Sequence, residues 1–201
     1  MKKMVTRQIA LTISLALALL GGLPLLSLSV SATATSSATS IVSVFPNTQI
    51  VSAGESFDVD VIISTDVASR GAQCGLDFDP DILDYTGFTE GSFYKDWASA
   101  HGGSTMLFPI PSENPAGHVT DVGIAVMGGD PGGPEGSGIL VTLHFTALAD
   151  GVSPLHLANV KVSDAEAGTI ADVDTNDGQV MVGPTPTPTP TTTAPATTGR
   201  R

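Results

Sequence analysis

Residues 56–64 read SFDVDVIIS, a stretch in which apolar and polar side chains alternate. Successive side chains on a β-strand point to opposite sides of the sheet, so this alternation predicts a strand with one buried face. The buried face would carry Phe57, Val59, Val61 and Ile63, and the solvent face would carry Asp58, Asp60 and Ser64. One covered and one solvated face is typical of antiparallel sheets.

The same period of two recurs along the chain, as in ILVTLHFTA at residues 139–147 and VTDVGIAVM at 119–127. Clusters of Gly, Pro and Asp, such as GGDPGG at 128–133, mark turns between the patterned stretches. Nine short strands with one apolar face each predict an all-β, antiparallel sandwich of two sheets. The expected strands are residues 41–45, 57–63, 73–78, 83–89, 106–110, 119–127, 139–147, 153–162 and 179–182.

The charge balance excludes two classes of partner. The chain has 201 residues, with 20 Asp or Glu against 8 Lys or Arg, and a formal net charge of −12. Between residues 41 and 183, only Arg70, Lys95 and Lys161 oppose all 20 acids, which leaves −17. Nucleic acids and anionic membrane surfaces both attract clustered basic residues, so we expect neither as a partner.

Residues 1–34 have the three-part layout of a secretory signal peptide. Three basic residues among the first seven precede an apolar run from Ile9 to about Val30, and the cleavage candidates Ala32 and Ala34 follow. The mature protein is therefore expected to be secreted, either extracellular or associated with the cell surface. No membrane insertion is expected after cleavage.

Two segments of biased composition flank the patterned block at residues 41–183. Residues 35–40 are a short Ser/Thr spacer, and residues 184–201 read PTPTPTPTTTAPATTGRR. A Pro/Thr tract buries no core and adopts an extended polyproline-like conformation, so we interpret the second segment as a linker or tail.

The polar residues show no catalytic or metal-binding pattern. Four Asp crowd into residues 77–84, but Asp79 precedes a proline and is interpreted as a turn former, and the four His are scattered without metal-ligand spacing. Residues 172–178, DVDTNDG, alternate oxygen ligands but lack the Gly and Glu positions of an EF-hand loop, which favours an acidic hairpin turn. Cys74 shares a strand face with Leu76, which favours a buried side chain over a reactive thiol. We expect no enzyme, no cofactor and no metal site.

Five stretches of the block occur in an order and spacing that resemble the cohesin family, the receptor modules of cellulosome-type assemblies. The run FDPDIL at residues 78–83 is the most specific piece of the resemblance. The stretches are VSVFPNTQIVSAGESFDVDVIIS (42–64), RGAQCGLDFDPDILDYTGFTEGSF (70–93), GSGILVTLHFTALADG (136–151), LANVKVSDAEAGTI (157–170) and DGQVMVG (177–183).

The resemblance implies a nine-stranded jelly-roll sandwich that binds a dockerin, a small helical module carried by extracellular polysaccharide-degrading enzymes. The calcium of such a pair is expected on the dockerin and not on this chain. Carbohydrate-binding modules share the fold, so polysaccharide binding is an alternative, and an extracellular structural or adhesion module is another. Sugar binding needs exposed aromatic rings, and Phe93, Tyr94 and Trp97 are the candidates for such a platform.

Cohesins use the sheet that contains their third, fifth, sixth and eighth strands, so the resemblance also nominates partner-binding residues. Met127 and Leu140 are the informative ones, because an apolar residue on the polar side of a strand is what an interface requires. The nominated residues are Gln73, Gly75 and Asp77 on the third strand, Ala125, Met127 and Gly128 at the end of the sixth, and Leu140 and Thr142 on residues 139–147, taken as the eighth.

Overall fold

The computed structural model describes residues 40–166, 168–170 and 173–183. The expected signal peptide, the spacer up to residue 39 and the tail lie outside the described residues. This part of the chain forms eleven strands and one helix. The strands are β1 Ser40–Phe45, β2 Thr48–Ser52, β3 Ser56–Thr65, β4 Ser69–Asp77, β5 Leu83–Glu90, β6 Gly103–Leu107, β7 His118–Gly128, β8 Gly136–Ala147, β9 Gly151–Asp164, β10 Val173–Asn176 and β11 Gly178–Gly183, and the helix is α1 Ser92–Ala100. Across these residues, no helix has the length and apolarity needed to cross a membrane.

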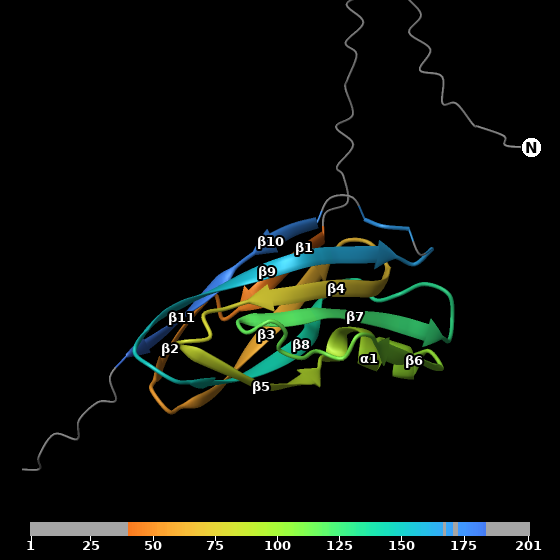
Figure 1. Ribbon diagram of the computed structural model, residues 1–201. Coiled ribbons are helices and arrows are strands. Elements are labelled where there is room, and N and C mark those ends of the chain that lie inside the picture. Colours follow the sequence, from red (N-terminus) through yellow and green to blue (C-terminus); the bar gives the residue numbers. More distant parts are fainter. Residues whose placement is uncertain (1–39, 167, 171–172, 184–201) are drawn as a thin grey trace, which may run out of the picture. The chain divides into compact units, whose positions relative to one another are not determined.

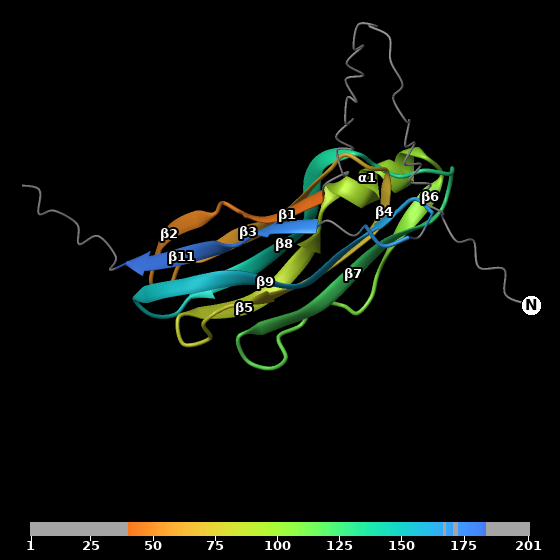
Figure 2. The same ribbon diagram turned by 90° about the horizontal axis from the view of Figure 1, so that it is seen from above.

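The strands form two sheets packed face to face (Figures 1 and 2). One sheet has five strands in the order β10-β1-β3-β8-β5, and the other has six in the order β2-β11-β9-β4-β7-β6. In Figure 1, β9, β4 and β7 of the six-stranded sheet lie in front of β1, β3 and β8. The all-β sandwich predicted from the sequence is confirmed.

The strand count and the pairing differ from the prediction at two places. β2 and β10 were not expected, and they pair in parallel with β11 and β1, whereas the other ladders are antiparallel. Both strands arise where the chain crosses from one sheet to the other, between β1 and β2 and again at Asp177 between β10 and β11. The predicted hairpin at residues 172–178 is therefore wrong, because β10 and β11 belong to different sheets.

The core lies between the two sheets and is built by the alternating apolar positions of both. Phe145 on β8 is fully buried at its centre, with the rings of Phe57, Phe78 and Tyr85 at centroid distances of 5.9, 5.2 and 5.8 Å. Offset and edge-to-face ring pairs of this kind add to the free energy of apolar burial. Cys74 belongs to the same core, and burial, with a smaller effect from the charge of Asp121, raises the pKa of its thiol to about 12. The thiol is therefore neutral and shielded, as predicted.

Helix α1 occupies the segment that contains the three aromatic candidates for a sugar platform. Phe93 and Tyr94 are buried, and the Tyr94 hydroxyl lies 2.5 Å from Ser69 Oγ on β4. A Cβ at Gly138 on β8 would lie 2.8 Å from the Phe93 ring, so the glycine makes room for the helix. Two of the three rings belong to the core, so the alternative of a three-ring sugar platform is not available.

Candidate functional site

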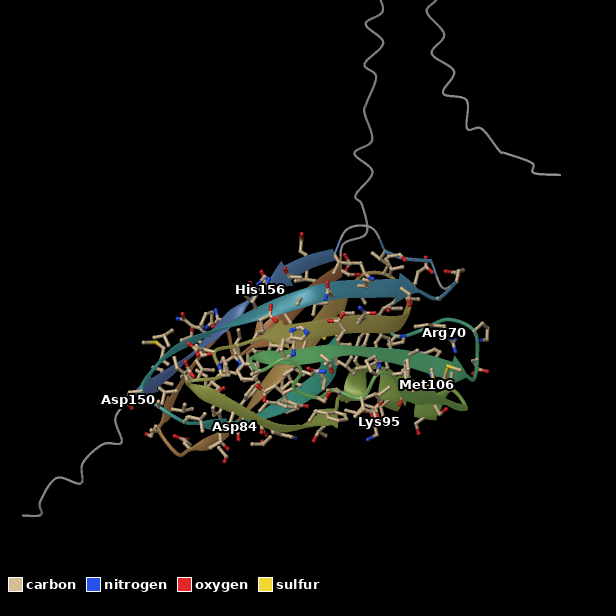
Figure 3. All side chains as sticks on the ribbon, in the orientation of Figure 1. Arg70, Asp84, Lys95, Met106, Asp150 and His156 are labelled. Atoms are coloured by element: carbon tan, nitrogen blue, oxygen red, sulfur yellow. The ribbon has the colours of Figure 1, made fainter. Side chains whose placement is uncertain are left out.

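The solvent face of β9, β4, β7 and β6, hereafter the outer face, carries exposed apolar, amide and charged side chains in separate regions. Figure 3 labels Met106 near one end of this face and His156 nearer the other. The strand registers place its outward side chains in cross-strand rows, because directly opposed residues of neighbouring strands point to the same side. Gln73, Gly75 and Asp77 of β4 and Ala125 and Met127 of β7 lie on this face.

Two rows at one end of the face form a shallow groove of about 360 Å³. Its floor includes a row of small residues, because Ala125 on β7 lies opposite Gly71 on β4, and Gln73 also lines it. Met106 and the Phe108 segment border the groove beside β7, and Lys161 and Ser163 of β9 border it on the other side. The row of Gly71 and Ala125 leaves room for an inserted side chain from a partner.

The β6 side of the groove is apolar and open to solvent. Phe108 is 76% exposed, Ile110 66%, Met106 49% and Met127 47%. Of these four, Met106 and Phe108 line the groove itself. Large apolar side chains exposed next to a groove are of the kind that marks interaction sites on soluble proteins. Of these four residues, only Met127 was predicted from the sequence to lie at the interface. The overlooked signal is that Met106 and Phe108 flank the half-buried Leu107, and therefore share the outward side of their strand.

The centre of the face is a hydrogen-bonded amide and carboxylate cluster around Asp121 on β7. Gln73 on β4 donates to one carboxylate oxygen at 3.2 Å, and Asn159 on β9 donates to the other at 3.2 Å. Asp121 reaches across β4 because Gly75 lies between, where a Cβ would stand 2.5 Å from Asp121 Oδ1. Gly75 is thus buried beneath the cluster, and its lack of a side chain leaves the space that the Asp121 carboxylate occupies.

The far end of the face carries a row of alternating acids and imidazoles, hereafter the acid–histidine row. It consists of Asp177, His156, Asp77 and His118, which lie on successive neighbouring strands or directly before one. His118 donates through Nδ1 to Asp77 at 2.5 Å, and His156 donates through Nδ1 to Asp177 at 2.6 Å. The row places four titratable groups side by side on an exposed surface.

The two members of the row with resolved shifts move in opposite directions. The hydrogen bond to Asp177 raises the pKa of His156, and the charges of Asp177 and Asp77 add to that effect. Burial favours a higher pKa for Asp177, but hydrogen bonds from the Leu157 amide and from His156 outweigh it and hold the pKa below its ordinary value. Each charge therefore stabilises the other.

The structure contradicts the placement of Leu140 and Thr142. β8 lies in the five-stranded sheet, and the eighth expected strand in chain order is residues 153–162, which is β9. Leu140 is 2% exposed because the β3 and β8 register shifts there, with Val61 opposite Val141 and Ile62 opposite Ile139. Leu140 is the extra residue of this bulge, so the alternation that pointed it outward breaks. Thr142 points to the other side of the molecule and donates to Asp60 at 2.6 Å.

Gly128 ends β7 and begins the turn that leads to β8. Arg70 of β4 holds this turn, because its guanidinium donates to the carbonyls of Gly128, Asp130 and Gly132 at 2.5, 2.9 and 2.8 Å. The same guanidinium lies 5.6 Å from the centroid of the Trp97 ring. One of the three basic residues of the block is thus committed to a structural role beside Met127.

On the five-stranded sheet, the solvent-facing side chains of an aspartate, a histidine and a threonine form a hydrogen-bonded chain. His144 donates through Nδ1 to Asp58 at 2.7 Å, and its Nε2 lies 2.8 Å from Thr89 Oγ1. His144 occupies the polar side of its strand, as predicted. The described residues contain no group of three or more His, Cys, Asp or Glu that could hold a metal ion.

The fold is that of cohesin modules. A non-cellulosomal cohesin from the archaeon Archaeoglobus fulgidus superposes with a TM-score of 0.54 and 17% identity, over 72% of this chain and 91% of the other. A type II cohesin from an adaptor scaffoldin of Acetivibrio cellulolyticus gives 0.58 and 15%, over 77% and 96%. A cohesin from the same organism, solved in complex with a dockerin, gives 0.55 and 14%, over 71% and 98%. No protein-family model and no curated protein matches the chain.

Proposed function

We propose that this chain is a secreted, non-catalytic, cohesin-like module that binds a calcium-loaded dockerin through its outer face. The observation that carries the proposal is the apolar-rimmed groove, which lies on the sheet that the sequence resemblance nominates. The similar structures add support, since several are cohesins in complex with dockerins. The role is assembly of polysaccharide-degrading enzymes rather than catalysis.

The groove supplies the affinity in this proposal. Fully burying a large apolar side chain stabilises a complex by ~1.5–3 kcal/mol, and interface energy concentrates in a few such anchors. Phe108 and Met106 border a row of small residues, so an apolar side chain of a partner helix has both a cavity to fill and walls to contact. The hydrogen-bonded cluster at Asp121 then provides the polar contacts that fix register.

The charge of the block sets the speed of association. A formal charge of −17 between residues 41 and 183 repels acidic proteins and attracts a dockerin whose contact surface is basic. The rate of association should therefore fall as ionic strength rises. Sugar binding loses its support, because Phe93 and Tyr94 are buried and Trp97 stacks on His101 at a centroid distance of 4.1 Å.

The test is direct binding of the purified secreted chain to calcium-loaded dockerins from the same organism, measured by titration calorimetry with and without EDTA. A saturable 1:1 complex that disappears on chelation, together with no retention on insoluble polysaccharide, supports the proposal. Retention on polysaccharide without any dockerin complex would replace it with the carbohydrate-binding alternative. Failure to bind either ligand would favour a structural or adhesive module.

A further inference from the structure

The acid–histidine row has a free side that its own hydrogen bonds do not use. Each histidine contacts its aspartate through Nδ1, which fixes the neutral tautomer with its proton on that atom. Within the described residues, no hydrogen bond of the Nε2 atoms of His118 and His156 is found. His144 on the opposite sheet differs, because its Nε2 meets Thr89. Two hydrogen-bond acceptors thus remain for a ligand when the rings are neutral.

Protonation cancels the net charge of the row and reverses the hydrogen-bonding character of its free ring nitrogens. With both imidazoles neutral, Asp177 and Asp77 give the row a formal charge of −2, and with both protonated the charge is zero. A protonated ring also presents Nε2–H as a donor instead of an acceptor. The same surface therefore attracts a cation in one state and lacks that attraction in the other.

The charged groups next to the row add to its attraction for a cation when the rings are neutral. Asp121 of β7 lies one row away, and its Oδ1 and His118 Cε1 both lie beside Gly75. Glu113, in the segment before β7, accepts from the Gly117 amide next to His118. Lys161 of β9 lies beyond Asp121, at the groove. The charged groups that flank the row on β7 and in the preceding segment are acidic, so a cationic ligand is the chemistry that the row fits.

His156 gains its proton in a pH range that an extracellular protein meets. The pKa of His156 is raised from 6.5 by its contact with Asp177, so the ring gains its proton above that pH. A modest acidification of the medium is enough to change the charge of the row.

We propose that Asp177, His156, Asp77 and His118 bind a cationic side chain of the docked partner and release it when the histidines are protonated, which makes docking weaker in acid. This inference rests on the proposed function, because it concerns the same face. It specifies a partner whose contact helix carries an apolar residue over the groove and a Lys or Arg over the row. Along β4, Gln73 and Asp77 are four residues apart, or ~13 Å, which a helix spans in about nine residues.

The test compares dockerin affinity from pH 8.0 to 5.5, at saturating calcium, for three proteins. The wild-type affinity should fall ~10-fold or more, since binding that requires loss of a proton weakens up to tenfold per pH unit below the pKa. The double variant His118→Gln with His156→Gln should change less than ~2-fold over the same range. His144→Gln, which alters the matched histidine on the opposite sheet, should keep the wild-type dependence. Retention of that dependence by the double variant overturns the proposal.

If no dockerin binds, the proposed function has failed and the row is tested by itself. The probe is then a helical peptide whose one charged side chain is an arginine, titrated into the isotopically labelled chain and followed by NMR. Amide shifts at Asp77, His118 and His156 at pH 8.0 that vanish at pH 5.5 support the cation site. Equal shifts around His144, or shifts that grow in acid, contradict it.

Discussion

The solvent faces of the two sheets both arise from strand alternation, but they carry different side chains. On the five-stranded sheet, the outward polar side chains satisfy one another, as in the contacts of Asp58 with His144 and of Asp60 with Thr142. On the six-stranded sheet, large apolar side chains stand in solvent beside a row of glycine and alanine. A face whose polar groups are already paired gains little from a partner, whereas an apolar rim around a groove gains by being covered.

The largest expected effect is a difference in stability between variants of Leu140 and Met127, which were both predicted from the sequence to point outward. Leu140→Asp puts a carboxylate into the core and should destabilise the protein by at least ~3 kcal/mol, because a buried unpaired charge is costly. Met127→Asp changes an exposed side chain and should stay within ~1 kcal/mol of wild type. Urea unfolding of both variants checks the contrast. Equal stability of the two would place Leu140 at the surface.

The next effect concerns binding. Phe108→Asp should weaken the dockerin complex at least ~30-fold, as expected for loss of an anchor worth ~2 kcal/mol. The matched control is Ile50→Asp on β2, since Ile50 has the same 76% exposure on the same sheet but lies far from the groove in strand order. Calorimetry of both variants with one dockerin makes the comparison. A similar loss for Ile50→Asp would move the interface to the β2 side.

A smaller effect is expected at the centre of the face. Gly75→Ala should displace Asp121 and cost ~1–2 kcal/mol of stability through its two amide hydrogen bonds. The double variant Gly75→Ala with Asp121→Ala removes the clash, so the two substitutions should be less than additive in thermal unfolding. Gly183→Ala, where a Cβ meets nothing within 4 Å, is the control. Full additivity would mean that Gly75 makes no room for Asp121.

The smallest effect is the pH dependence of stability from His156 and Asp177. The raised pKa of His156 means that its contribution is present in acid and is lost as the pH rises through that pKa, above 6.5. The lowered pKa of Asp177 means that its contribution is present near neutrality and is lost as the pH falls below its ordinary value of 3.8. The stability difference between wild type and His156→Gln should therefore peak between these limits and stay below ~1 kcal/mol. A difference that increases above pH 8 would contradict this assignment.

The sequence was sufficient for the sandwich because its strongest signals are local. The alternation at Phe57 to Ile63 and the burial of Cys74 depend only on which side chains share a strand face. Errors arose where a non-local event interrupts the alternation. The bulge at Leu140 depends on a register shift between β3 and β8. β2 and β10 each pair in parallel with a strand that is distant in sequence.

The candidate site was predictable in part for the same reason. Gln73, Asp77 and Met127 follow from strand alternation and lie on the outer face. Phe108 follows the last residue of β6, and its exposure depends on its pairing with Gly123 across to β7. The acid–histidine row joins residues from positions 77 to 177, so only the sheet order brings them together.

The most direct test of the central claim is amide hydrogen exchange of the full chain, with and without a saturating calcium-loaded dockerin. The account predicts added protection along β6, the outer-face positions of β4 and β7, and the segment around Phe108, with β3 and β8 unchanged. Protection confined to β3, β5 and β8, or spread equally over both sheets, would contradict it.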